Sequence, residues 1–140
     1  MLISKFLIFG LIVSTTPFIE NTYASFGDIT LTPPQTVGFD GKELDSINVG
    51  KPVGFSSVLT NHAKSEQKFT YLVQILNKDG GTDYLEGLSA SLLPNQSFTA
   101  SQSWIPSEAG AYTVQVFVWE SLSSSIPLTQ VIQTQITVQQ

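Results

Sequence analysis

The sequence of 140 residues contains no cysteine and no arginine, and it has a single histidine, His62. Without cysteine there is no disulfide, no thiolate nucleophile and no thiolate metal site, and a blue-copper centre is excluded as well. A lone histidine in a polar loop is interpreted as a solvated residue. An extracellular domain without disulfides must rely on its apolar core, and about 115 residues are enough to build one.

Charge is also scarce. Charged residues make up 12% of the chain, whereas soluble domains carry about 25%. The net charge of −5 repels a phosphate backbone, and the lysines form no basic stripe, so we expect no nucleic-acid binding. The hydrophobic content of 41% is too high for a disordered chain. Beyond Lys5, the scattered lysines are Lys42, Lys51, Lys64, Lys68 and Lys78.

Residues 1–24 have the pattern of a signal peptide. Lys5 provides the positive start, Phe6 to Val13 form a short apolar run, and Thr22-Tyr-Ala24 offers a cleavage site. The alternative is an uncleaved membrane anchor, but an anchor needs about 20 consecutive apolar residues and this run is shorter. We therefore expect an extracytoplasmic product, secreted or associated with the cell surface, without a membrane span. Its single domain would occupy residues 25–140.

After the signal segment, short runs of alternating hydrophobic and polar residues are separated by turn sequences. No stretch shows a sustained helical period, and this pattern is typical of an all-β sandwich. We predict an immunoglobulin-like Greek-key β-sandwich of seven to nine strands. The expected strand segments are 28–32, 35–39, 53–61, 69–75, 82–88, 89–93, 98–104, 112–119 and 132–138.

The segment Glu108-Ala-Gly-Ala-Tyr112 supports the Greek-key interpretation. A tyrosine just after a glycine, at the start of a valine-rich strand, is typical of a tyrosine corner. In that corner the phenol hydroxyl bonds to the backbone slightly upstream and fixes the crossover between the sheets. We therefore predict that Tyr112 is a structural corner residue. The alternative is an ordinary core tyrosine.

Several turn and core signatures resemble the CARDB-type modules, which are immunoglobulin-like domains of bacterial and archaeal secreted and surface proteins. The chain is especially similar to secreted archaeal proteins with one such module, and the resemblance covers about residues 45–140. It implies a non-catalytic domain with a part in cell adhesion, and it supplies no catalytic or cofactor residues. The signatures are Val49 to Asn61, Leu93 to Ser97, Ser103 to Pro106 and Gly110 to Tyr112.

Asn95 marks one departure from these modules, which often have glycine between the proline and the glutamine of this turn. Asparagine tolerates a positive φ better than other non-glycine residues, so we expect the turn to be kept. Asn95-Gln-Ser97 is also an acceptor sequence for N-glycosylation. It is used only where the host glycosylates, and a bare turn asparagine is the alternative.

Two clusters of acidic residues are candidates for metal sites. Asp40, Glu43 and Asp45 lie close together in the sequence, and Asp79 and Asp83 flank a Gly-Gly turn. Calcium takes six to eight oxygen ligands, which clustered carboxylates on a loop can supply. Neither cluster has the spacing of a known calcium loop, so we interpret these residues as turn formers. No metal or other cofactor is predicted.

Strand parity singles out one aromatic pair as candidate binding residues. In the strand that begins at Tyr112, the valines alternate with Phe117 and Trp119, so these two side chains should face away from the core. An exposed aromatic pair beside the serine-rich loop 121–125 would suit a sugar ring or a protein partner. The alternative is that this loop or a neighbouring strand covers Trp119. Trp104 is predicted to be core.

No constellation of nucleophile, base and metal ligands is present, so we do not expect an enzyme. The favoured interpretation is a non-catalytic secreted or cell-surface module that binds a protein or a glycan at the cell envelope, as in adhesion. The alternative is a small carbohydrate-binding module, in which Phe117 and Trp119 would form a flat exposed platform. A metal-carrying or enzymatic accessory protein is a more remote alternative.

Overall fold

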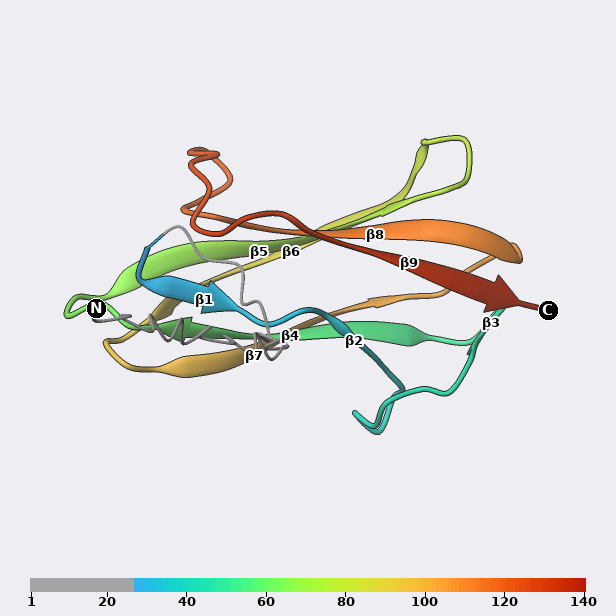
Figure 1. Ribbon diagram of the computed structural model, residues 1–140, viewed down its shortest axis with the longest axis horizontal. Coiled ribbons are helices and arrows are strands. Elements are labelled where there is room, and N and C mark those ends of the chain that lie inside the picture. The colour runs from blue at the N-terminus through green and yellow to red at the C-terminus, as the bar shows by residue number, and fades with distance from the viewer. Residues whose placement is uncertain (1–26) are drawn as a thin grey trace, which may run out of the picture.

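The structure is a computed structural model that describes residues 27–140, so the predicted signal segment lies outside the described residues. Within them, nine strands form two sheets and no helix is present (Figure 1). No helix able to cross a membrane therefore occurs in this part of the chain. The strands are Ile29–Leu31 (β1), Gln35–Val37 (β2), Ile47–Asn48 (β3), Val53–Asn61 (β4), Gln67–Leu76 (β5), Thr82–Leu92 (β6), Ser97–Trp104 (β7), Gly110–Trp119 (β8) and Ile132–Gln139 (β9).

The two sheets pack face to face, which confirms the predicted all-β sandwich. In the smaller sheet β4 is central, with β7 along one edge and β1 followed by β2 along the other. The larger sheet has the order β3-β9-β8-β5-β6, in which β3 runs parallel to β9 and the other neighbours are antiparallel. Pro33 and Pro34 separate β1 from β2, because proline has no N–H for the ladder.

Two expectations about strand bounds were wrong. Residues 82–88 and 89–93 were expected as separate segments, but β6 runs without a break because Ser89 and Ala90 stay paired with β5. Phe39 was expected at the end of a strand, but β2 stops at Val37. Phe39 instead lies in a turn closed by a 2.8 Å bond from Gly38 N to the Lys42 carbonyl, and its side chain is fully exposed.

The core is a single apolar layer between the sheets. Residues alternate between buried and more exposed along β4 and β8, so each strand contributes every second side chain to this layer. Burial of apolar surface at about 25 cal/mol per Å² is the main force that holds the sheets together. The largest fully buried side chains are Tyr71, Phe55, Phe69, Leu31, Leu59, Ile75, Leu92, Val53, Val73, Val114, Val116 and Val118.

Tyr71 adds a polar link between the two sheets. Its hydroxyl lies 3.3 Å from the Phe55 carbonyl oxygen and 3.2 Å from Ser57 Oγ, so β5 is joined to β4 inside the core. The Tyr71 side chain is fully buried. Burial raises the pKa of Tyr71 from 10.0 to about 12, and the bond with Ser57 opposes this shift only in part.

The raised pKa of Tyr71 predicts a loss of stability at high pH. Neutral Tyr71 stabilises the fold fully below about pH 10, and this contribution is lost as pH rises toward 12, where the unfolded chain ionises first. We expect the free energy of unfolding in urea to fall by about 2–3 kcal/mol over this interval. The free energy of unfolding of the Tyr71→Phe variant should fall less steeply with pH. Parallel curves for the two proteins would contradict the assignment to Tyr71.

Tyr112 has the geometry of a tyrosine corner. Its hydroxyl donates a 2.8 Å hydrogen bond to the carbonyl oxygen of Glu108, four residues upstream. Gly110 lies between the two with φ at +147°, a value that other residues rarely adopt. The Tyr112 ring meets Trp104 edge to face, with 5.0 Å between centroids. The bond therefore fixes the connection from β7 to β8 as the chain crosses between the sheets.

Tyr112→Phe should lower the free energy of unfolding by about 1–2 kcal/mol, because the Glu108 carbonyl loses its partner while the ring packing is kept. Urea unfolding measures the change. Tyr84→Phe is a matched control, because the Tyr84 hydroxyl has no hydrogen-bond partner among residues 27–140. If both variants unfold at the same midpoint, the corner bond does not stabilise the fold.

Candidate functional site

Phe117 and Trp119 lie on the outer face of the larger sheet. In β8 the residues from Tyr112 to Val118 alternate between buried and partly exposed, and the aromatic pair falls in the partly exposed phase. Neither ring faces the core, and neither is fully open to solvent. The degree of burial must therefore come from neighbours on the same face.

Those neighbours belong to β5 and β6. The register places Phe117 opposite Leu72 and Trp119 opposite Thr70, and both β5 residues are buried although they face outward. The position beside Leu72 in β6 is Gly87, where a Cβ atom would lie only 2.8 Å from Leu72 Cδ2. Gly87 thus leaves room for Leu72 to lie flat on the sheet next to the aromatic rings.

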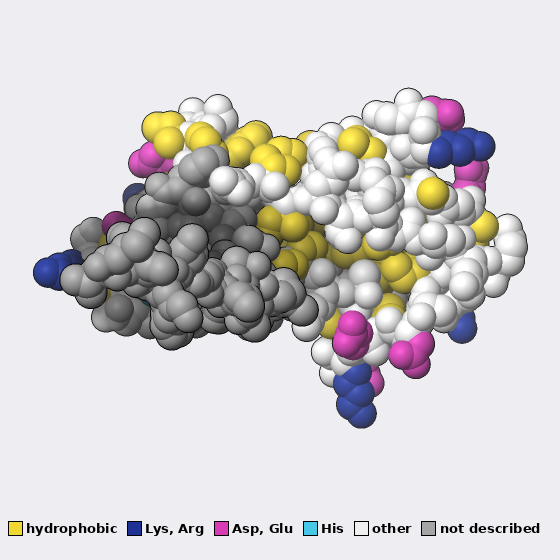
Figure 2. Space-filling view, viewed as in Figure 1, with side chains coloured by type: hydrophobic (Ala, Val, Ile, Leu, Met, Phe, Trp, Pro, Cys, Tyr) yellow, Lys and Arg dark blue, Asp and Glu magenta, His cyan; other side chains and the backbone are white. Residues whose placement is uncertain are grey.

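The loop between β8 and β9 extends this surface. Trp119 forms an isolated bridge with Pro127, and Glu120 N donates a 2.9 Å bond to the Ile126 carbonyl, so the loop continues the hairpin beyond the sheet (Figure 1, upper left). Figure 2 shows hydrophobic side chains on this loop and along the adjoining sheet. We call this surface the outer apolar patch, and it consists of Leu72, Phe117 and Trp119 on the sheet and of the exposed Leu122 and Val131 in the connection to β9.

The aromatic pair does not form a flat platform. The ring centroids of Phe117 and Trp119 are 6.0 Å apart and their planes meet at 60°. A sugar ring stacked on one ring would meet the other at a steep angle, so this geometry argues against a carbohydrate platform at these two residues. The patch contains no titratable group. It suits apolar contact with a partner rather than a chemical step.

The acidic turn residues and His62 make local contacts. Asp40 Oδ1 accepts a 3.1 Å bond from the Lys42 amide within the turn. His62 Nε2 lies 3.0 Å from Thr30 Oγ1 and ties its loop to β1. Across residues 27–140, no group of three or more histidine, cysteine or acidic side chains is arranged to hold a metal ion. Glu43 and Asp45 are therefore not brought together with Asp40 as ligands.

Asn95 occupies the turn between β6 and β7 with φ at +61°, the only positive φ of a non-glycine residue in the described part of the chain. The Gln96 amide donates a 3.0 Å bond to the Leu93 carbonyl and closes the turn. The turn is therefore kept with asparagine in place of glycine. The Asn95 side chain is exposed, so the acceptor sequence for glycosylation lies on the surface.

Two surface features gave no recognisable signal in the sequence. The first is the fully exposed Phe39, which a hydrophobic pattern places inside. The second is a groove of about 740 Å³ at the end of the sandwich away from loop 121–125, lined by Asp83, Trp104 and Glu108 among others, which we call the end groove. Strand parity correctly placed the Trp104 ring in the core, but it did not indicate that the edge of the ring reaches a groove.

Comparison with known proteins identifies the fold. No family model and no curated protein matches the sequence. Among solved structures, the CARDB domain of the PF1109 protein from Pyrococcus furiosus, in complex with di-metal ions, matches with a TM-score of 0.58 and 17% identity over 84% of this chain and 96% of that domain. The C-terminal domain of wzt matches with a TM-score of 0.65 and 10% identity, over 87% of this chain and 80% of that chain.

Larger enzymes contain a similar domain. A β-glucosidase from Listeria innocua, in complex with isofagomine, matches with a TM-score of 0.58 and 12% identity, over 80% of this chain but only 16% of the enzyme. The resemblance to CARDB modules noted in the sequence is thus confirmed as a likeness of fold. At these identities the likeness defines an immunoglobulin-like β-sandwich and does not define an activity.

Partial burial of Trp119 predicts a moderate effect on stability. Trp119→Ala should lower the free energy of unfolding by about 1–2 kcal/mol, since only part of the ring is removed from water. Trp104→Ala, in the core, should cost about 3–5 kcal/mol, and Phe39→Ala should cost almost nothing. Urea unfolding of the three variants gives the comparison. A loss for Trp119→Ala as large as that for Trp104→Ala would make Trp119 a core residue.

Proposed function

We propose that this domain is a non-catalytic, extracytoplasmic interaction module that binds another protein through the outer apolar patch. The observation that carries the proposal is that the outward-facing Phe117 and Trp119 rings adjoin a β8–β9 connection that exposes Leu122 and Val131. Large aromatic residues at the centre of an apolar surface provide most of the binding energy in protein interfaces. Contiguous apolar patches of this kind are uncommon on proteins that have no partner.

The charge of the chain restricts the partner. Glu120 lies at the rim of the patch, and the chain carries a net charge of −5. A partner with an apolar centre and a basic rim would be attracted, and an acidic partner would be repelled. The extracytoplasmic location rests on the signal-like sequence of residues 1–24. The proposed absence of catalysis is supported by the sequence, which has no cysteine and only one histidine, His62.

Similar structures support no second function at the patch. The CARDB domain from Pyrococcus furiosus is in complex with di-metal ions, but residues 27–140 of this chain bring together no group of three or more candidate ligands. The β-glucosidase is matched over a small fraction of its length, so its catalytic activity provides no argument for this domain. The tilt of the two rings disfavours a sugar platform at the same place.

The proposal predicts that patch substitutions weaken binding to an envelope protein. The exported protein is used to capture partners from the cell envelope of its host, and the affinity of each captured protein is then measured. Trp119→Ala should weaken binding by more than about 1 kcal/mol, or more than about five-fold. Val131→Ser should act in the same direction with little loss of stability, because Val131 is 49% exposed.

Leu93→Ser is the matched control, because Leu93 is 57% exposed and lies in the turn that leads from β6 to the smaller sheet, outside the patch. It should leave the affinity unchanged. Because the contact is apolar, the affinity should also survive added salt better than an ion-pair interface would. Equal effects of Val131→Ser and Leu93→Ser, or no effect of either, would reject the patch as the binding surface.

A further inference from the structure

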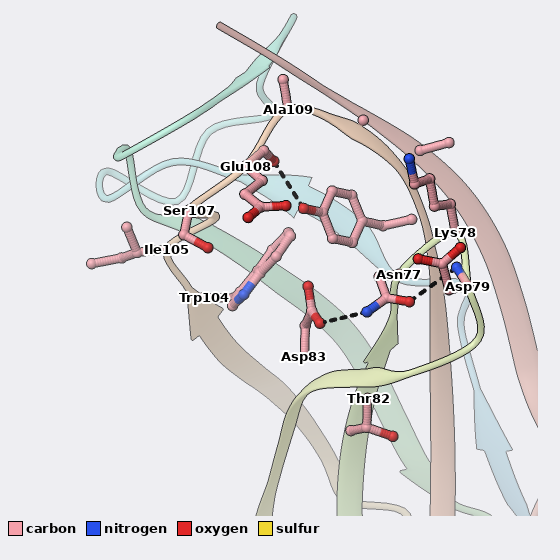
Figure 3. Close-up of a pocket in the computed structure, with 13 residues that line it drawn as sticks. Asn77, Lys78, Asp79, Thr82, Asp83, Trp104, Ile105, Ser107, Glu108 and Ala109 are labelled. Atoms are coloured by element: carbon pink, nitrogen blue, oxygen red, sulfur yellow. Dashed lines mark hydrogen bonds between the residues drawn. The ribbon is translucent and has the colours of Figure 1, made fainter.

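The end groove lies between two connections at one end of the sandwich. One wall is formed by the β5–β6 turn and the start of β6, and the other by the β7–β8 connection (Figure 3). Its volume of about 740 Å³ is in the range of sites for small ligands. It lies at the opposite end of β8 from the outer apolar patch, so a ligand in the groove is independent of the proposed function.

Trp104 presents an unused hydrogen-bond donor to this groove. The residue is only 7% exposed, and its ring packs against Phe55 and Tyr112, with centroids 6.4 and 5.0 Å away. Figure 3 shows the nitrogen end of the indole turned toward the space between Asp83 and Ile105. No group within residues 27–140 accepts a hydrogen bond from Trp104 Nε1. A tryptophan buried to this extent usually has such an acceptor.

Two carboxylates face the same space. Asp83 is held in place because one oxygen accepts a 2.9 Å bond from Asn77 Nδ2, while Asn77 Oδ1 accepts bonds of 3.0 Å from the Asp79 and Gly81 amides. The Glu108 side chain has no partner in the described chain, since only its backbone carbonyl is bonded to Tyr112. Desolvation, with Asp83 and Glu108 nearby, raises the pKa of Tyr112. Both charges therefore lie close to its hydroxyl.

The groove lining thus combines the N–H donors of Trp104 and Lys78 with the carboxylates of Asp79, Asp83 and Glu108. An ammonium group or a metal ion can satisfy the carboxylates but cannot accept from Trp104. An anion would be repelled, because the three carboxylates outnumber the single ammonium of Lys78. A hydroxyl both accepts and donates, and a ring with adjacent hydroxyls can do both at once. Ile105, which is 58% exposed at the rim, provides an apolar surface for the C–H groups of such a ring.

We propose that the end groove binds a neutral sugar. One hydroxyl of the sugar accepts from Trp104 Nε1, and neighbouring hydroxyls donate to the carboxylates of Asp83 and Glu108. Two of the three groups on the protein side are already held in place, Trp104 by its core packing and Asp83 by its bond from Asn77. Little ordering is therefore required when the ligand binds.

The chain has two tryptophans, which makes the test direct. Their two indole N–H signals in a proton–nitrogen NMR spectrum are assigned with Trp104→Phe and Trp119→Phe. The exported protein is then titrated with glucose, galactose, mannose, N-acetylglucosamine and their disaccharides. At least one sugar should shift the Trp104 indole signal in a saturable way and leave the Trp119 signal unchanged.

Asp83→Asn and Glu108→Gln should each lower the affinity for that sugar about ten-fold or more, because a hydrogen bond to a charged acceptor is lost. Asp45→Asn is the matched control, with the same change of charge outside the groove, and should have no effect. Trp104→Phe removes the donor and keeps a ring. The two acid variants test the site even where this core substitution impairs folding.

Three outcomes would overturn the proposal. In the first, none of the sugars shifts the Trp104 signal. In the second, calcium chloride alone produces a saturable shift that Glu108→Gln abolishes, which would make the groove a cation site. In the third, a sugar shifts the Trp119 signal instead, which would place glycan binding at the outer apolar patch. A loss of protein binding by Trp119→Ala does not bear on any of them.

Discussion

The structure depends on one apolar layer that joins β4 of the smaller sheet to β5 and β8 of the larger sheet. The chain has no cysteine, so burial holds the sheets together without a covalent link, and the Tyr71 hydroxyl adds a polar contact across the layer. This requirement fixes every second residue of the central strands as core. The residues in the other phase face outward and are not needed for the core, and Phe117 and Trp119 belong to that phase.

The fold could be predicted where the signals were local. The bounds of β4 agree with the expected strand because Val53, Phe55 and Leu59 alternate strictly between a Gly-Lys-Pro turn and a polar loop. Prediction failed where pairing decided the outcome. Residues 82–93 were expected as two segments, but β5 provides a continuous partner for β6. Phe39 is hydrophobic, yet the turn bonds around Gly38 and not its hydrophobicity determine its position.

The candidate site shows the same difference between local sequence signals and the effects of strand pairing. Parity along β8 indicated which way Phe117 and Trp119 face, because alternation is a property of a single strand. The extent of their burial depends on Leu72 and Thr70, which the register brings alongside from β5. The 60° angle between the rings is likewise a product of packing. The end groove had no local signal at all, because it combines residues from two connections that are distant in the sequence.

Both surfaces are positioned by β8, which runs from the corner at Tyr112 to the patch at Trp119. Trp119 is seven residue steps beyond Tyr112 along the extended strand, a distance of about 23 Å. β8 is paired along both edges, with β5 and β9, so its two ends are held in a fixed relation. Substitutions at sites this far apart, without shared contacts, usually have additive effects. The two proposed ligands, an apolar partner at one end and a hydroxylated ligand at the other, would therefore bind without disturbing each other.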